Sequence, residues 1–159
     1  MERRFRVGVI MDKKQIEAIV DIGDKPLVNR VAIATGLLKL SPDTISAIKG
    51  SNIPKGNVLE ASTIAAIQAV KSTPTLIPHC HPIPLESCNV EWEWDASSLR
   101  CTVEVSAHYK TGVEMEALTG VSVGLLCVFD MVKFMEKDSK GQYPTAVIHG
   151  VEVLQKMKG

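Results

Sequence analysis

The chain has 159 residues, 45% of them apolar, and its 18 basic and 18 acidic side chains cancel to a formal charge of zero. This size and composition predict one domain with a hydrophobic core of its own. A neutral chain lacks the overall positive charge that would favour nucleic acid or an anionic membrane surface as a partner. The four cysteines lack zinc-ribbon spacing and no secretory leader follows the first residues, so we expect reduced thiols in a cytoplasmic protein.

The first part of the chain predicts an arm followed by a strand. Residues 1–25 mix basic, apolar and turn-forming residues and are interpreted as an N-terminal arm, which leaves residues 26–159 as a single domain. Val28 to Leu40 is rich in β-branched and aliphatic residues on both faces, as is typical of a strand covered on both sides. Arg30, at the beginning of this strand, is either a surface charge or a contact for an anion.

Two helices follow. Ser41-Pro42-Asp43 combines a serine cap, a proline at the first helical position and an acid, which predicts a short helix that ends at Gly50. Lys55 then stands just before a longer amphipathic helix, residues 58–72. Because a helix N-terminus is already positive, a lysine beside it favours an anion such as phosphate between the two.

A proline-rich segment presents His79, Cys80 and His81 in succession, with four prolines in the eleven residues 74–84. Prolines make such a connector rigid, and rigid loops are common places for binding groups. Neighbours in an extended segment point in opposite directions, which disfavours one zinc ion held by all three residues, so we predict no metal site. A surface loop with incidental histidines and a loop that faces a ligand both remain open.

The second half of the chain completes a recognisable order of elements. Alternating apolar and polar residues predict a hairpin, with strands over residues 86–94 and 101–107 and a turn at 96–98. A long helix over 110–137 and a last strand over 145–154 follow. Strand, helix, hairpin, helix and strand make the βαββαβ plan, so we predict an α+β ferredoxin-like sandwich whose antiparallel sheet carries its helices on one face.

The long helix has a pattern that suggests more than a core element. One apolar row predicts its buried face, namely Leu118, Val121, Leu125, Val128, Val132 and Met135. A second row has unusually small side chains, which predicts that another backbone approaches closely along it. This row consists of Ala117, Gly120, Gly124 and Cys127. Charged residues lie at both ends of the helix, among them Asp130 three residues before Lys133.

Five separated segments occur in the same order as in a known family. They are VDIGDKP with Arg30, KGNVLEASTIAAIQAVK, IPHCHPIPL, KTGVEMEALTGVSV and FDMVK. Together they resemble the cyclic pyranopterin monophosphate synthase family of molybdenum cofactor biosynthesis, the MoaC type, over roughly residues 19–138. The chain departs from the family pattern at His79, where the family usually has leucine, and at Asn57, where it usually has aspartate.

The resemblance implies an enzyme that converts a cyclised dihydroguanosine triphosphate, made by a preceding radical enzyme, into cyclic pyranopterin monophosphate with release of pyrophosphate. It implies general acid–base catalysis by Lys55 and Lys133, with Asp130 orienting the ammonium of Lys133. Contact with Asp130 would raise the pKa of Lys133, so we expect burial or Lys55 to counteract that effect. The substrate-binding residues implied are His79, Cys80, His81, Glu114, Met115, Glu116 and Arg30. A basic residue near the C-terminus maps to Lys156 or Lys158.

No cofactor is required by this chemistry, although magnesium could accompany the triphosphate. The family resemblance also implies a homo-oligomer, a hexamer built from dimers. Glu116 and Lys133 lie too far apart on one helix for a single substrate, so we expect a site shared between two chains, with the small row of the long helix facing a partner's helix or the sheet. The alternative function is a non-catalytic ferredoxin-like regulatory domain that binds a nucleotide or metal ion at a subunit interface.

Overall fold

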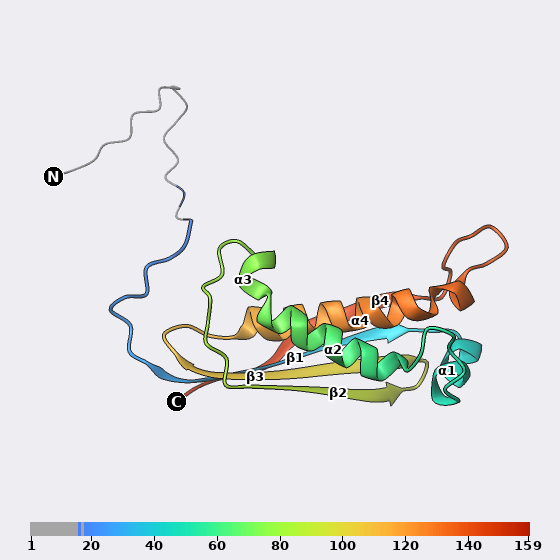
Figure 1. Cartoon of the computed structure of the whole chain (residues 1–159), viewed down its shortest axis with the longest axis horizontal. Coiled ribbons are helices and arrows are strands. Elements are labelled where there is room, and N and C mark those ends of the chain that lie inside the picture. The colour runs from blue at the N-terminus through green and yellow to red at the C-terminus, as the bar shows by residue number, and fades with distance from the viewer. Residues whose placement is uncertain (1–15, 17) are drawn as a thin grey trace, which may run out of the picture.

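The computed structural model describes residue 16 and residues 18–159 (Figure 1). Residues 1–15 and 17 of the predicted N-terminal arm therefore lie outside the described residues. In the part of the chain that the structure describes, the elements are β1 (Val28–Lys39), α1 (Pro42–Lys49), α2 (Val58–Lys71), α3 (Thr73–Leu76), β2 (Ser87–Asp95), β3 (Ser98–Tyr109), α4 (Glu114–Glu136) and β4 (Val147–Lys158).

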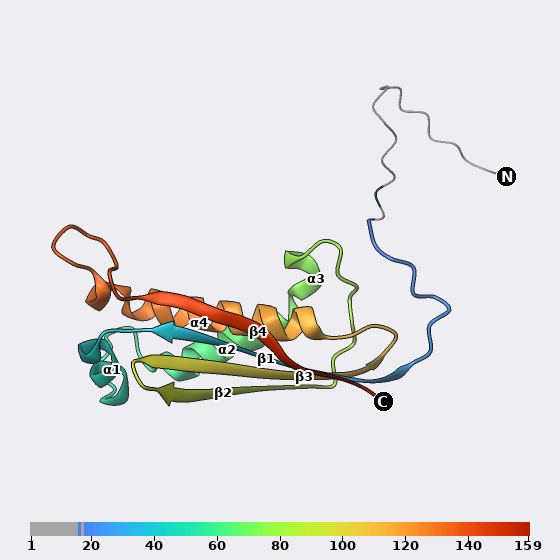
Figure 2. The same cartoon turned by 180° about the vertical axis from the view of Figure 1, so that it is seen from behind.

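The described strands form one antiparallel sheet in the order β2-β3-β1-β4. Helices α2 and α4 lie across one face of this sheet, and the view from behind shows the other face without a helix over it (Figures 1 and 2). This arrangement confirms the α+β ferredoxin-like fold. It also brings β4, the last strand, beside β1 at one edge of the sheet.

The expectation that β1 is covered on both faces is wrong. Ala32, Ala34 and Leu38 are buried on the face that carries α4, whereas Val31 and Ile33 on the opposite face are only half-buried. In the single chain, side chains of the sheet itself provide the cover on that second face. The apolar residues on both faces of β1 thus indicated its central position in the sheet. They did not indicate a second layer of structure over the other face of the sheet.

The long helix begins and packs somewhat differently from the prediction. It starts at Glu114, and Val113 at its N-cap supplies no side-chain hydrogen bond, so the first N–H groups of α4 lack a side-chain cap. Its predicted buried face is confirmed at four positions and partly confirmed at Leu118 and Met135, which are half-buried. By length and composition α4 could cross a membrane, but it packs against β1, β3 and β4 in the core of this domain.

The small row of α4 accommodates α2 of the same chain. A Cβ on Gly120 would lie 2.6 Å from Val70 Cγ2, and a Cβ on Gly124 would lie 3.3 Å from the Cβ of Ala66. Since α2 occupies this row, the idea that a partner's main helix packs along it is wrong. The glycines let two helices of one chain approach closely above the sheet.

Helices α1 and α2 follow their predicted signals, whereas the short α3 was not predicted. Ser41 Oγ accepts a hydrogen bond from the backbone N–H of Thr44 and begins α1, and Asn57 Oδ1 accepts one from Glu60 and begins α2. The last strand runs to Lys158 rather than ending near residue 154. That extension carries two lysines toward the beginning of α4.

Candidate active site

A pocket of about 470 Å³ opens at the N-terminal end of α4. Six of the predicted substrate-binding residues line it, namely His79, Cys80, His81, Glu114, Met115 and Glu116. The proline-rich loop after α3 supplies the first three and the first turn of α4 supplies the others. The structure therefore favours the interpretation of the histidine loop as one that faces a ligand.

Residues 18–25 run past this loop and complete the pocket. The Nδ1 atom of His79 contacts the carbonyl oxygen of Ala18, and the Nε2 atom of His81 lies 2.6 Å from the carbonyl oxygen of Val20. Lys110 Nζ donates a hydrogen bond of 2.6 Å to the carbonyl oxygen of Gly23. Val20 is one of the pocket residues that the residue-by-residue reasoning missed, together with Ile22 and Lys25. The resemblance of VDIGDKP to the family was the signal that could have found them.

The two carboxyl groups in this pocket have opposite pKa shifts. The side chain of Glu116 is 3% exposed, and its burial, with a smaller contribution from the charge of Glu114, raises its pKa. Burial also raises the pKa of Glu114, but a hydrogen bond from Lys156, whose Nζ lies 2.5 Å from Oε1, and the charges of Lys156 and Arg30 outweigh it and lower the pKa overall. Burial and the nearby Glu116 raise the pKa of the Cys80 thiol. The pocket thus holds one firmly ionised carboxylate and one that accepts a proton more readily.

A second pocket of about 320 Å³ adjoins the first and is lined by cationic side chains. They are Lys25, Arg30, Lys110, Lys156 and Lys158, and two of them, Lys25 and Lys156, line both pockets. Arg30 is only 8% exposed and donates from Nη2 to the carbonyl oxygen of Lys110 at 3.2 Å, so its guanidinium is held in place. Converging fixed cations of this kind favour a polyanion such as a triphosphate. Sequence reasoning indicated Arg30 and the C-terminal lysines but missed Lys25 and Lys110.

The predicted catalytic residues meet at the other end of α4. Asp130 accepts from Lys133 Nζ at 2.7 Å and from Lys55 Nζ at 3.1 Å, and Lys55 also donates to the backbone carbonyl of Asp130 at 2.9 Å. All three side chains are about half-exposed. One carboxylate therefore holds two ammonium groups beside the C-terminal part of the helix.

This pairing bears on two expectations about the lysines. Asp130, through its hydrogen bond and its charge, raises the pKa of Lys133, so the expected counteraction by burial or by Lys55 does not prevail in the single chain. The hydrogen bonds and charges of both lysines lower the pKa of Asp130. Lys55 pairs with Asp130 and Asn57 caps α2, while an anion between Lys55 and the start of α2 stays a prediction.

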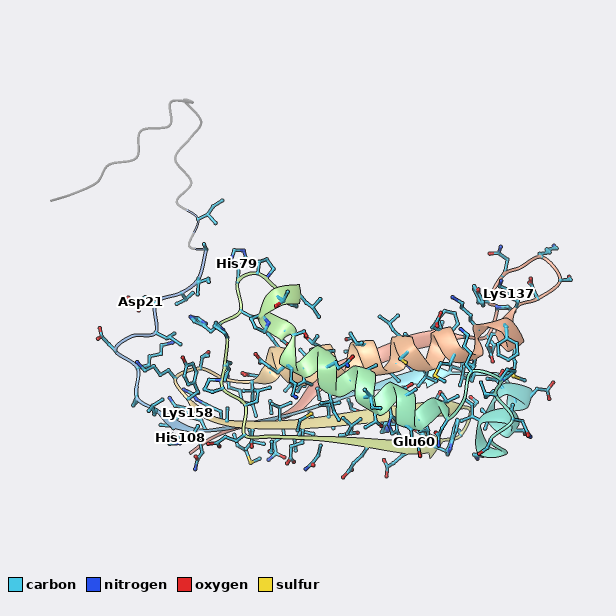
Figure 3. All side chains as sticks on the ribbon, viewed as in Figure 1. Asp21, Glu60, His79, His108, Lys137 and Lys158 are labelled. Carbon is cyan, nitrogen blue, oxygen red and sulfur yellow. The ribbon has the colours of Figure 1, made fainter. Side chains whose placement is uncertain are left out.

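The two clusters lie at opposite ends of one continuous helix. Glu116 and Lys133 belong to α4, and at about 1.5 Å per residue their seventeen-residue separation spans about 25 Å. Figure 3 shows His79 and Lys158 at one end of the domain and Lys137, just after α4, at the other. A single chain thus carries the predicted site residues as two separate groups, one at each end of α4, which we call half-sites.

The described residues contain no group of three or more histidine, cysteine or acidic side chains placed to hold a metal ion. The four cysteines are free thiols.

Comparison with known proteins supports the same kind of function as the geometry of the site. Residues 19–159 match the MoaC family. A protein of Thermococcus kodakarensis named probable cyclic pyranopterin monophosphate synthase is 51% identical over 149 residues, which cover 94% of this chain and 95% of that protein. A protein of the same name from Pyrococcus horikoshii is 51% identical over 148 residues, covering 93% of this chain and 92% of its own length.

A further relative, from Methanothermobacter thermautotrophicus, is named probable cyclic pyranopterin monophosphate synthase accessory protein and is 50% identical over 147 residues, which cover 92% of each chain. These findings confirm the resemblance carried by the five segments, and with it the prediction of an enzyme of molybdenum cofactor biosynthesis. The chain belongs to the MoaC family.

Proposed function

We propose that this protein converts (8S)-3',8-cyclo-7,8-dihydroguanosine 5'-triphosphate into cyclic pyranopterin monophosphate and releases pyrophosphate. The observation that carries the proposal is the pair of adjoining pockets at the beginning of α4. One offers a buried carboxyl, a histidine loop and an apolar wall, and the other offers five cations. A ligand with a purine-derived ring at one end and a triphosphate at the other matches both.

In this proposal the cationic pocket binds the triphosphate. Arg30 is fixed by backbone carbonyls, and Lys110 ties residues 18–25 to the pocket. Glu114 holds Lys156, so one cation is oriented before the substrate arrives. The N–H groups at the start of α4 add a partial positive charge. Met115 and Glu116 face the base-derived end, where a carboxyl with a raised pKa can exchange a proton with a ring nitrogen.

Lys133 and Lys55 supply the proton transfers. The raised pKa of Lys133 keeps it an ammonium at neutral pH, so it begins as a proton donor. Asp130, whose pKa is lowered, remains a carboxylate and orients both lysines. Displacement of Lys133 from Asp130 by substrate would lower the pKa of Lys133 and let its amine accept a proton in a later step.

Because the two half-sites are about 25 Å apart on one helix, we propose that each active site combines the first-turn end of α4 from one subunit with the Lys133 end from another. Exposed apolar side chains on α4 and β4 support association of subunits, and they include Leu126, Phe134, Leu154 and Met157. We further propose that the enzyme works in the cytoplasm, which its free thiols favour.

The direct test is turnover of the purified cyclised triphosphate, with pyrophosphate and the pyranopterin product measured together. The proposal predicts both products in equal amounts, without an added redox cofactor. Assays with and without magnesium establish whether the triphosphate needs that ion. Tight binding of the triphosphate without turnover would instead support the regulatory-domain alternative.

A further inference from the structure

The loop between α4 and β4 is folded by its own hydrogen bonds. The Oδ1 atom of Asp138 accepts from the backbone N–H groups of Lys140 and Gln142, both at 2.8 Å. The backbone of Asp138 also pairs with that of Gln142 at 2.9 Å, and Gly141 adopts a positive φ of 76°, which glycine accommodates without strain. Tyr143 follows directly after this turn, so the turn sets where its ring goes.

The turn sends Tyr143 back onto α4. Its ring packs edge to face against Phe129, with 5.2 Å between the ring centroids and 75° between the ring planes. Phe129 lies four residues before Lys133 and directly before Asp130, and residues four apart lie above one another on a helix. Tyr143 is 36% exposed, so its ring lies outside the core, at the edge of the cluster formed by Lys55, Asp130 and Lys133.

The electrostatics agree with this placement. Asp130 is the main cause of the raised pKa of Lys133, and ionised Tyr143 adds a smaller contribution in the same direction.

We propose that Tyr143 is a positioning residue of the active site, whose hydroxyl holds the amino group of Lys133 in place when substrate draws it away from Asp130. This inference rests on the proposed function. A lysine that leaves its carboxylate needs another hydrogen-bond partner to keep its direction, and a phenol can both accept from an ammonium and donate to an amine. The Phe129 contact fixes the ring, and the Asp138 turn fixes the backbone that carries it.

The test separates the hydroxyl from the ring. Tyr143→Phe keeps the packing on Phe129, so the melting temperature should stay unchanged while kcat falls about tenfold or more and KM changes little, as expected for loss of one hydrogen bond to a charged group. The pH profile of kcat should shift, and the ¹⁵N signal of the Lys133 amino group should titrate at a lower pH. Ser139→Ala removes an exposed hydroxyl from the same loop and should leave all five quantities unchanged.

The turn provides a second, independent variant. Asp138→Ala removes the oxygen that accepts the two loop N–H groups and should lower kcat and shift the Lys133 titration in the same direction as Tyr143→Phe. Asp138→Asn keeps an oxygen acceptor at that position and should restore both.

Unchanged kcat, pH profile and Lys133 titration in Tyr143→Phe would overturn the inference. A variant that raises KM alone would overturn it as well, because it would make Tyr143 a binding contact and not a positioning residue. If the wild-type protein binds the cyclised triphosphate without turnover, the proposed function fails, but the Lys133 titration in that complex still tests the contact.

Discussion

Asp130 holds together the proposed catalytic cluster of Lys55, Asp130 and Lys133, because it is the partner of both lysines. Lys133 lies one turn further along the same helix, whereas Lys55 comes from a loop 75 positions earlier in the chain. The shared carboxylate keeps two like charges close together, which they would otherwise avoid. Exposed ion pairs of this kind add little to stability, which is compatible with the catalytic role proposed for the cluster.

Lys133→Ala should therefore abolish activity without unfolding the protein. Loss of a general acid–base group costs about 10²–10⁴ in rate. The measurement is pyrophosphate release from purified substrate, together with the melting temperature. Lys137→Ala, an exposed lysine one turn later, is the matched control and should remain active. Near-normal turnover by Lys133→Ala would show that the lysine has another role.

Asp130→Asn should change the titration of Lys133 in a defined direction. Asp130 raises the pKa of Lys133, so the ¹⁵N signal of Lys133 should titrate at lower pH in the variant. A Lys133 titration that does not move in the variant would contradict the pairing seen here.

The same pair makes a small contribution to stability with a defined pH range. The pKa of Asp130 is lowered in the folded chain, so its contribution is present above the unfolded value of about 3.9 and is lost as the pH falls through the lower folded value. Lys133, with a raised pKa, contributes below about 10.4 and loses its contribution as the pH rises through the higher folded value. Any difference in melting temperature between wild type and Asp130→Asn should therefore disappear in strong acid, and it should shrink with added salt.

At the scale of elements, α2 and α4 pack closely together. Ala66 and Val70 of α2 face Gly120 and Gly124 of α4. On α2 the larger Leu59 and Ile67 are only half-buried, while Ser62 and Ala66 are fully buried. The interhelical distance is thus set by the absence of side chains and not by interlocking large ones.

Alanine substitutions at the two glycines of this contact should differ in their cost. A Cβ at position 120 would come within 2.6 Å of Val70, so Gly120→Ala should destabilise the protein by about 1–3 kcal/mol through overpacking. A Cβ at position 124 would lie 3.3 Å from the Cβ of Ala66, a tight contact that needs only a small shift of the helices, and alanine favours a helix by about 1 kcal/mol over glycine, so Gly124→Ala should destabilise the protein less than Gly120→Ala does. Chemical denaturation measures both, and equal effects would refute this account of the packing.

At the scale of the whole molecule, the helices and the sheet keep the two half-sites apart. The sheet places β4 beside β1 and so brings the C-terminal lysines to the beginning of α4, while α1 and its following loop carry Lys55 to the other end (Figures 1 and 3). No bending of a packed core helix would bring these ends together. The proposed complete site would therefore combine residues of two subunits.

Co-refolding of two inactive variants tests this arrangement. In a mixed pair of Glu116→Gln and Lys133→Ala subunits, one shared site carries both defects and the other carries neither, so random mixing should restore about a quarter of the wild-type activity. The control is Lys55→Ala mixed with Lys133→Ala, which damages both shared sites at the same half and should remain inactive. No recovery in the first mixture, despite demonstrated subunit exchange, would place the whole site in one chain or Glu116 outside it.

The features that depend on neighbouring residues were predictable from the sequence. Caps at Ser41 and Asn57, the hairpin, the apolar face of α4 and the pairing of Asp130 with Lys133 all follow from helix and strand geometry over a few positions. The order of these elements was enough to predict the ferredoxin-like sheet, because short, right-handed connections leave few alternatives.

The features that depend on distant residues were decided by the tertiary structure. A row of small residues predicts a close neighbour but not which helix it is, and only packing assigned α2 to it. The register of the sheet places Arg30 beside Lys158. It thereby brings cations from the beginning and the end of the domain's sequence into one pocket, although the chain as a whole is neutral. The partner of Lys55 was likewise beyond local reasoning, because its contact with Asp130 exists only once the loop after α1 has packed against the end of α4.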